Sequence, residues 1–290
     1  MNALRALRSI SRLSCVAAGL LGLLSLAACA PMSSHGADDY FDGEALQLAI
    51  AAETGDSDTI TRLVKEEGVD PDEVFARRDG IPVLAWPIRA RNLEGLSALL
   101  EAGADPNARE SKHMNGEMIH FNNAMVFAAM MDDPRYLALL LKHGGDPNIR
   151  NVNNETLLFQ AFISGNQWEN VKVLVENGAD VNESNMGSAD TVLSWYTGRG
   201  GFEYAYWLLE HGADATMLMV PPKESGKPPR MIMAEDIYWE ITTPDLLPWQ
   251  KKCQQWLVAR GIARPPMPEH IRKKREAFGF PTNETEIPLL

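Results

Sequence analysis

The chain has 290 residues, 45% of them hydrophobic, and 39 acidic side chains outnumber 27 basic ones. This length allows one elongated domain or two small ones. The acidic excess argues against a nucleic-acid partner, because neutralising phosphates requires a basic surface. It is typical of a soluble surface, and the alternative is that it attracts a cationic partner.

Residues 1–28 have the features of a targeting segment. A basic start is followed by an apolar stretch over residues 13–26, which is too short to span a bilayer. The stretch ends in Leu26-Ala27-Ala28-Cys29, which resembles the lipobox of bacterial lipoproteins. That resemblance implies cleavage before Cys29, acylation of its thiol and, because Ala30 follows, a lipid anchor in the outer membrane that faces the periplasm. The alternative is an ordinary signal peptide with a chance cysteine.

Cleavage at this site changes the properties of the mature chain. It removes three arginines and no acid, so the formal charge changes from −12 to −15. Cys253 then remains as the one cysteine with a free thiol, which excludes an intramolecular disulfide. Residues 29–42 are expected to form a short lipid-anchored tether.

A turn motif recurs along the middle of the chain. Its clearest copy is Gly103-Ala104-Asp105-Pro106-Asn107, where glycine suits the left-handed end of a helix and the next residues favour a turn. Related turns begin at Gly68, Gly144, Gly178 and Gly212, and the steps between successive glycines are 35, 41, 34 and 34 residues. A period of this size predicts a solenoid of stacked repeats.

The repeats resemble the ankyrin repeat over residues 43–216. The Gly-x-Asp-x-Asn turns match that family closely, whereas its Thr-Pro-Leu-His start is incomplete in every copy. The resemblance implies an all-α ankyrin solenoid of about five to six helix-turn-helix repeats with finger loops. Small residues in the first helices, such as Ala51, Ala52, Ala128, Ala129 and Ala161, would let neighbouring first helices approach closely.

The pattern degrades after residue 216. Residues 217–262 are expected to form an insertion loop and a degenerate capping repeat, with helices at 231–241 and 249–260. Residues 263–290 form a proline-rich basic tail around a helix at 269–277. Its run Arg272-Lys273-Lys274-Arg275 is expected to face water or the acidic solenoid, and the alternative is contact with anionic lipid.

Two insertions interrupt the period, at residues 109–118 and 217–230. Such loops often lie on a binding face, although they are also places where surface drift is tolerated. The first insertion contains His113 and is followed by His120, but without further ligands these histidines do not predict a metal site. No phosphate loop, nucleophile elbow or Cys-x-x-Cys motif is present, so no cofactor and no catalysis are expected.

Several other polar residues have structural interpretations. His143 and His211 precede the glycines that end their helices, where a cation suits the negative end of the helix dipole. Asp132-Asp133-Pro134 is typical of a helix start.

Two columns of aligned first-helix positions give the strongest functional signal. The first holds Ile50, Trp86, Phe127, Gln160 and Trp195, and the second holds Glu53, Arg89, Met130, Ile163 and Gly198. Large aromatic residues at the edge of a concave face suggest apolar anchors for a partner. The alternative is that the first column packs between helices.

These features predict a protein-binding module, expected to act as a monomer. The predicted partner-binding residues are Trp86, Arg89, Phe127, Met130, Ile163, Trp195, Arg109, Lys112, His113 and Met114. Lipoproteins of similar architecture include immunity proteins that neutralise periplasmic toxins such as type VI secretion lipases. The alternatives are an envelope scaffold, a partner protein of a periplasmic enzyme, or a hydrolase that uses His113 or His120.

The lipobox interpretation predicts that Cys29→Ser releases the protein from membranes, because the substitution removes the thiol that would carry the lipid. Fractionation of cells that express either form measures the effect. Retention of the variant in the membrane fraction would contradict the interpretation.

Overall fold

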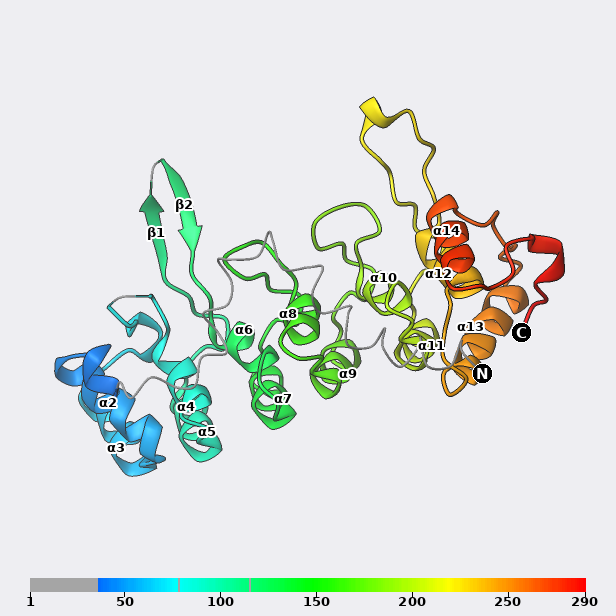
Figure 1. Ribbon diagram of the computed structural model, residues 1–290. Coiled ribbons are helices and arrows are strands. Elements are labelled where there is room, and N and C mark those ends of the chain that lie inside the picture. The colour runs from blue at the N-terminus through cyan, green and yellow to red at the C-terminus, as the bar shows by residue number, and fades with distance from the viewer. Residues whose placement is uncertain (1–35, 78, 115) are drawn as a thin grey trace. The chain divides into compact units, whose positions relative to one another are not determined.

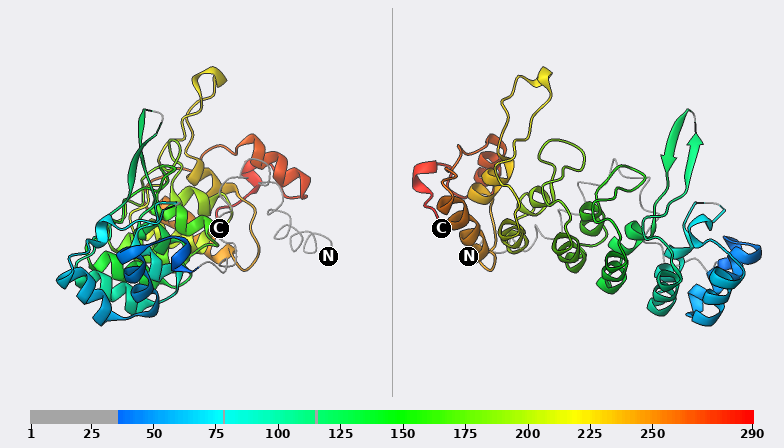
Figure 2. Two further views of the ribbon diagram at one scale, coloured as in Figure 1. Left: turned by 90° about the vertical axis from the view of Figure 1, so that its left-hand side faces the viewer. Right: turned by 180° about the vertical axis from the view of Figure 1, so that it is seen from behind.

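The computed structural model describes residues 36–77, 79–114 and 116–290, so the expected leader, Cys29 and the first half of the expected tether lie outside the described residues. The chain divides into two compact units, one ending at Met186 and the other beginning at Gly187. They are called here the first unit and the second unit, and each is described by itself (Figures 1 and 2).

The described part of the first unit contains four helical hairpins, one per repeat. Their helices are α2 (Gly43–Thr54) with α3 (Ser57–Thr61), α4 (Trp86–Arg89) with α5 (Leu93–Ala102), α6 (Ala124–Ala129) with α7 (Pro134–Lys142), and α8 (Leu157–Ile163) with α9 (Trp168–Glu176). Short helical turns precede or extend them at Ala37–Asp39, Arg62–Glu66, Pro71–Glu73 and Val83–Ala85. The first helices α2, α4, α6 and α8 pack in one row, and α3, α5, α7 and α9 pack in a second row.

Polar side chains define where these helices begin. The Asn92 side chain accepts from Gly95 N (2.8 Å), and the Asp133 carboxylate accepts from Arg135 N (3.0 Å). Thr156 Oγ1 accepts from Phe159 N (3.2 Å). Each bond satisfies an amide that has no partner inside its helix. The predicted helix start at residues 132–134 is therefore confirmed.

The recurring glycines end the helices as predicted. Gly103 ends α5 with φ 110°, and Gly144, Gly178 and Gly212 have φ between 92° and 95°. This left-handed conformation carries no steric penalty for glycine. His143 and His211 occupy the C-cap positions of α7 and α11 (Phe202–Glu210), in agreement with their predicted structural role.

The turns that follow these glycines are joined by side-chain hydrogen bonds from one repeat to the next. Asn107 Oδ1 accepts from Asp146 N (2.7 Å), and its Nδ2 donates to Gly144 O (3.0 Å). Asn148 repeats both bonds, to Asp180 N (2.7 Å) and Gly178 O (3.2 Å). In the first repeat Asp72 accepts from Asp105 N (2.8 Å), but a carboxylate has no hydrogen to donate. We call this series the turn ladder.

The two rows of helices approach closely at one recurring position, the third residue of the second helix. In α5 this residue is Gly95, where an added Cβ would lie 1.8 Å from Ala52 O. In α9 it is Asn170, whose Nδ2 donates to Ala129 O (3.0 Å) and Met131 O (2.7 Å). The small residues Ala52, Ala128 and Ala129 are buried at these contacts, each of which joins a first helix to the second helix of the next repeat.

The segment just before the first repeat is part of the folded unit. Ala37 is buried, and Phe41 has an exposed fraction of 1%. Arg77 donates to Phe41 O (3.3 Å) and pairs with Asp42 (2.8 Å). The expected tether of residues 29–42 is therefore packed against the fold from residue 37 onward.

The second unit contains further paired helices, followed by segments that do not follow the repeat pattern. Helices α10 (Val192–Thr197) and α11 pack on α12 (Ile232–Trp239) and α13 (Leu247–Ala259), and the last two lie close to the helices predicted at residues 231–241 and 249–260 for the expected capping repeat. Between these pairs, Met219 and Arg230 form an isolated β-bridge that closes the 217–230 insertion around a turn at Lys223–Ser225.

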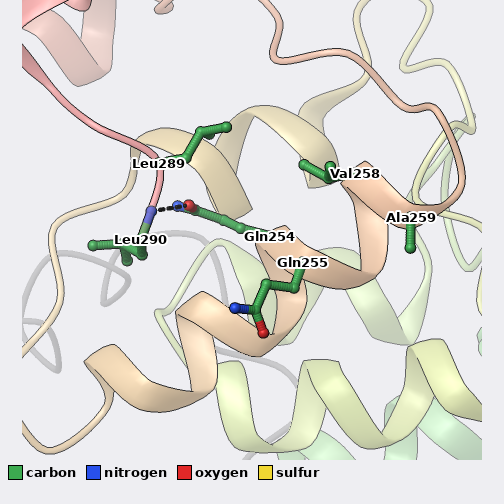
Figure 3. A pocket seen from close by; sticks show the side chains of 6 residues that line it. All are labelled: Gln254, Gln255, Val258, Ala259, Leu289 and Leu290. Atoms are coloured by element: carbon green, nitrogen blue, oxygen red, sulfur yellow. Dashed lines mark hydrogen bonds between the residues drawn. The ribbon is translucent and has the colours of Figure 1, made fainter.

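The C-terminal tail packs on this capping repeat. Helix α14 (Glu269–Ala277) has the predicted bounds, and a last turn lies at Glu284–Glu286. Trp239 Nε1 donates to Pro265 O (2.8 Å), and Tyr238 Oη donates to Ile262 O (2.9 Å). Leu290 N donates to Gln254 Oε1 (2.9 Å; Figure 3). Among the described residues, no helix combines the length and the apolar character that crossing a membrane requires.

The turn ladder predicts opposite effects for two exchanges of Asp and Asn. Asp72→Asn should raise the free energy of unfolding by about 1 kcal/mol, because the amide can donate to the next turn as Asn107 and Asn148 do. Burial and neighbouring carboxylates also raise the pKa of Asp72, so its ionised form is disfavoured in the folded chain, and the gain should shrink in acid.

The reciprocal change, Asn107→Asp, should lower the free energy of unfolding by a similar amount. Urea unfolding at neutral pH measures both variants. Equal stability of the two variants and the wild type would show that the hydrogen bond donated by the amide side chain to the next turn contributes nothing to the free energy of unfolding.

Candidate protein-binding surface

The first column of aligned positions is mostly interior. In the first unit, Ile50 is exposed and Phe127 is half-buried, whereas Trp86 and Gln160 are buried. Gln160 Nε2 donates to Glu155 (2.9 Å). The column is therefore not a continuous apolar surface.

Trp86 is buried because the segment before the first repeat covers it. Its exposed fraction is 4%, and its ring lies 5.1 Å from that of Tyr40 and 5.3 Å from that of Phe41, measured between centroids. Its Nε1 donates to Glu53 (3.0 Å). The expectation that Trp86 offers its ring to a partner is corrected by this placement, which favours the packing alternative.

Arg89 belongs to the same cluster. Its guanidinium lies 5.2 Å from the Trp86 ring centroid and 5.3 Å from that of Tyr40, and the side chain is half-buried. Such stacking holds the cation in place without neutralising it. Arg89 thus remains partly accessible beside a buried aromatic cluster.

Trp195, in the second unit, is also an interior residue. Its exposed fraction is 7%, and its Nε1 donates to Asp190 Oδ1 (2.6 Å). A hydrogen-bonded indole at this depth packs the fold, so the expectation of an exposed anchor is corrected here too.

The second column leaves an apolar area on α6 and α8. Ile163 has an exposed fraction of 48%, while Met130 and Phe127 are half-buried. Met130 and Ile163 occupy equivalent positions on neighbouring first helices. We call Phe127, Met130 and Ile163 the α6–α8 patch, and it contains the predicted anchor residues that the structure leaves accessible.

The insertion at residues 109–118 extends this unit as a β-hairpin. Strands β1 (Ser111–Met114) and β2 (Glu117–His120) pair antiparallel, with Ser111 opposite His120 and His113 opposite Met118. The hairpin projects from the helices of its unit (Figures 1 and 2). The sequence predicted a long finger loop here but gave no sign of strands, because its alternation of polar and apolar residues is weak.

The predicted specificity residues of the hairpin have different surroundings. Arg109 donates to Arg150 O (3.2 Å), and this bond supports the base of the hairpin. Burial lowers the pKa of its guanidinium. Lys112 pairs with Glu110 (2.7 Å) and lies 5.3 Å from the Phe121 ring centroid. His113 is exposed, and the side chain of Met114 lies outside what the structure describes.

Chemistry on the hairpin is limited to one polar pair. Ser111 Oγ and His120 Nδ1 lie 2.7 Å apart, and both residues are exposed. Water surrounds this pair, whereas catalytic pairs are usually activated in a site that excludes water. In the described part of the chain, no three His, Cys, Asp or Glu residues gather as they would around a metal ion.

The second unit contains the buried carboxylates of Glu235 and Glu240 and the half-buried carboxylate of Asp236, which the sequence did not reveal. Asp236 accepts from Thr197 Oγ1 (3.3 Å), and burial together with the Glu240 charge raises the pKa of Asp236 to about 7. Nearby, Glu235 pairs with Arg230 (3.0 Å) and Glu240 pairs with Lys274. In the sequence these acids look like the polar side of a surface helix, since their surroundings depend on partners distant in the chain, such as Thr197 for Asp236 and Lys274 for Glu240.

Proline-rich segments of the second unit border an open groove of about 750 Å³. Pro228 and Pro229 come from the insertion, and Pro265, Pro266 and Pro268 come from the tail. His270 also lines it, with a pKa lowered by burial and by the neighbouring Arg230. The groove shows that the two segments outside the repeat pattern lie side by side.

Comparison with known proteins identifies the repeat type. Residues 125–219 match the model of a family described as ankyrin repeats (3 copies). The chain carries ankyrin repeats. The ankyrin repeat domain of Bcl-3, a member of the IkappaB protein family, superposes with a TM-score of 0.54 at 22% identity, over 72% of this chain and 85% of that one. The ankyrin repeat protein EF0377 gives 0.53 at 23% identity, over 74% and 99%.

These similarities confirm the predicted all-α ankyrin-repeat fold, and ankyrin repeats are protein–protein interaction modules. A curated relative, Protein PhlB of Serratia liquefaciens, is 34% identical over 130 residues. That match covers 44% of this chain and 52% of PhlB, so the chain spans about half the length of the curated relative it matches.

The raised pKa of Asp236 predicts a pH-dependent stability. Because the folded state holds this proton more tightly than the unfolded state, the contribution of Asp236 should fall as pH rises from about 4 to about 7. Asp236→Asn should therefore be more stable than the wild type at pH 8, by an amount on the order of a few kcal/mol that vanishes near pH 4.

Thermal unfolding across this pH range measures the difference, with Glu276→Gln, an exposed carboxyl on α14, as the control. A difference between Asp236→Asn and the wild type that does not change with pH would contradict the assignment.

Proposed function

We propose that the protein is a non-enzymatic binding module that uses the α6–α8 patch to hold a protein partner. The observation that carries this proposal is Ile163, a large aliphatic side chain on a first helix with an exposed fraction of 48%. Burial of such a side chain against a partner would contribute about 1.5 kcal/mol or more.

The surroundings of the patch support this assignment. Met130 and Phe127 extend the apolar area, while Arg89 supplies charge on the neighbouring first helix, α4. An apolar centre with a polar rim is the usual composition of a protein interface. The hairpin offers His113 and the exposed Met118 as further contacts.

The proposed location is the periplasmic side of the outer membrane, through the lipid on Cys29. It rests on the lipobox-like sequence alone. Anchoring a binding module at the membrane raises its effective concentration for partners that arrive there. A toxin delivered to the periplasm, such as a type VI lipase, fits this arrangement, and an immunity protein is the role we propose.

An envelope scaffold, or a partner protein of a periplasmic enzyme, is the alternative role for the same surface. A neighbouring gene that encodes a toxin favours immunity, and one that encodes a housekeeping enzyme favours the alternative. The exposed Ser111–His120 pair is the feature on which the hydrolase alternative would rest, and unchanged function of a variant with His113 and His120 both replaced by Ala would exclude that alternative.

Ile163→Asp should weaken partner capture about tenfold or more without unfolding the protein, because it places a carboxylate at the centre of the apolar area. The measurement is capture from an envelope extract by tagged chain, quantified for each protein that the wild type retains. Ala138→Asp, which makes the same kind of change at an exposed position of α7, is the matched control. Equal capture by all three proteins would place the interface elsewhere.

The immunity role is tested separately, by the survival of challenged cells. Cells that lack the gene and are challenged by sibling attackers should die, and they should be rescued by the wild type but not by Ile163→Asp. Survival without the gene would refute immunity and leave the binding surface to be judged by the capture experiment.

A further inference from the structure

Helix α13 and the segment after it are basic in an otherwise acidic chain. From residue 246 to residue 268 the sequence contains no Asp or Glu, but it contains Lys251, Lys252, Arg260 and Arg264. The whole chain carries a formal charge of −12. Residues 246–268 therefore carry a net positive charge, although the chain as a whole is negatively charged.

The helix presents most of this charge to solvent. Its buried side is formed by Gln250, Cys253, Gln254 and Leu257, spaced as one face of a helix. Lys251, Lys252 and Arg260 are exposed on the remaining sides. Val258, with an exposed fraction of 53%, lies two turns after Lys251 on the same side of the helix.

Two of these cations are held over tryptophan rings. Lys252 Nζ lies 3.8 Å from the Trp249 ring centroid, and Arg260 Cζ lies 3.6 Å from the Trp256 ring centroid. The Lys252 ammonium is also 5.4 Å from the Tyr206 ring centroid, on α11. Stacking of this kind fixes the position of a cation but leaves its charge available to a ligand.

Carboxylates do not neutralise this charge. Within the part of the chain that the structure describes, none of Lys251, Lys252 and Arg260 forms an ion pair. The basic run on α14 differs in this respect. Arg272 pairs with Glu284, Lys273 with Glu269 and Lys274 with Glu240, and Arg275 is buried against the carbonyls of Trp239 and Pro281. That run is thus largely satisfied within its own unit.

Apolar surface adjoins the free cations. Val258 and Ala259 line an apolar groove of about 310 Å³ together with Leu289 and Leu290 (Figure 3). Leu289 and Leu290 are exposed, and so is Leu247 at the start of α13. Cations, tryptophans and aliphatic side chains occur together on this helix and its immediate neighbours.

We propose that this surface, formed by Trp249, Lys251, Lys252, Trp256, Val258 and Arg260, binds the anionic phospholipid surface of a membrane. Each Lys or Arg near such a surface contributes about 1 kcal/mol of attraction. Tryptophan favours the depth of the lipid headgroups, and exposed aliphatic groups favour the start of the acyl region. A membrane is favoured over an acidic protein because tryptophans and exposed aliphatic side chains accompany the cations on this helix.

The test uses the processed chain, residues 29–290 with Cys29→Ser, which contains every described residue and no acyl group. Its binding to vesicles of equimolar phosphatidylglycerol and phosphatidylcholine is measured by sedimentation and compared with binding to phosphatidylcholine alone. We expect a preference for the anionic vesicles of about tenfold or more. A molecule of this net charge would otherwise be repelled, so the preference would report a local site.

Two double variants with the same change of net charge locate the site. Lys251→Glu with Lys252→Glu should abolish the preference, whereas Lys223→Glu with Lys273→Glu, at exposed positions outside α13, should largely retain it. Val258→Asp keeps all cations and should weaken binding several-fold, since it opposes apolar insertion. Thermal unfolding confirms that each variant is folded.

Absence of vesicle binding by the unsubstituted chain would overturn the proposal. So would equal losses in the two double variants, because binding would then follow net charge alone. Full binding by Val258→Asp would show that the exposed aliphatic groups do not enter the lipid and would overturn that part of the proposal.

Discussion

The turn ladder is the interaction on which the first unit depends. Asn107 and Asn148 each join their own turn to the next one through a donated and an accepted hydrogen bond. A helical hairpin of this size cannot bury its apolar face alone, so its stability comes from its neighbour. By holding the spacing of the turns, the ladder sets how the first helices lie against each other, and this spacing determines which side chains reach solvent on α6 and α8.

The apolar face of a terminal repeat must be covered, and a different segment does so in each unit. In the first unit Tyr40 and Phe41 lie against Trp86, so an aromatic residue at a potential binding position becomes interior. In the second unit the tail covers the end of α12, where Trp239 is buried and its Nε1 donates to Pro265 O. Both features follow from segments outside the repeat pattern, which take accessible surface away from the repeats they cover.

Much of the fold could be predicted from the sequence, because the signals were local. The glycine turns, the helix start at Asp133 and the bounds of α14 each depend on a few adjacent residues. The exposure of aromatic residues could not be predicted in the same way. Trp86 and Phe127 occupy equivalent positions in the repeat pattern, yet one is buried and the other half-buried, because only Trp86 lies under the segment before the first repeat. The strands of the hairpin were missed because their alternating pattern is weak.

The close approach at Gly95 has a consequence for how such a chain can change. Gly95 leaves no room for a side chain beside Ala52, whereas the equivalent position in α9 holds Asn170, which bonds to the backbone of the preceding repeat. Each contact between neighbouring repeats therefore depends on the particular residues of the two repeats that it connects. Duplicating or exchanging single repeats would bring together residues that do not fit at these contacts. This array is therefore expected to evolve more readily by substitution within repeats than by exchange of whole repeats.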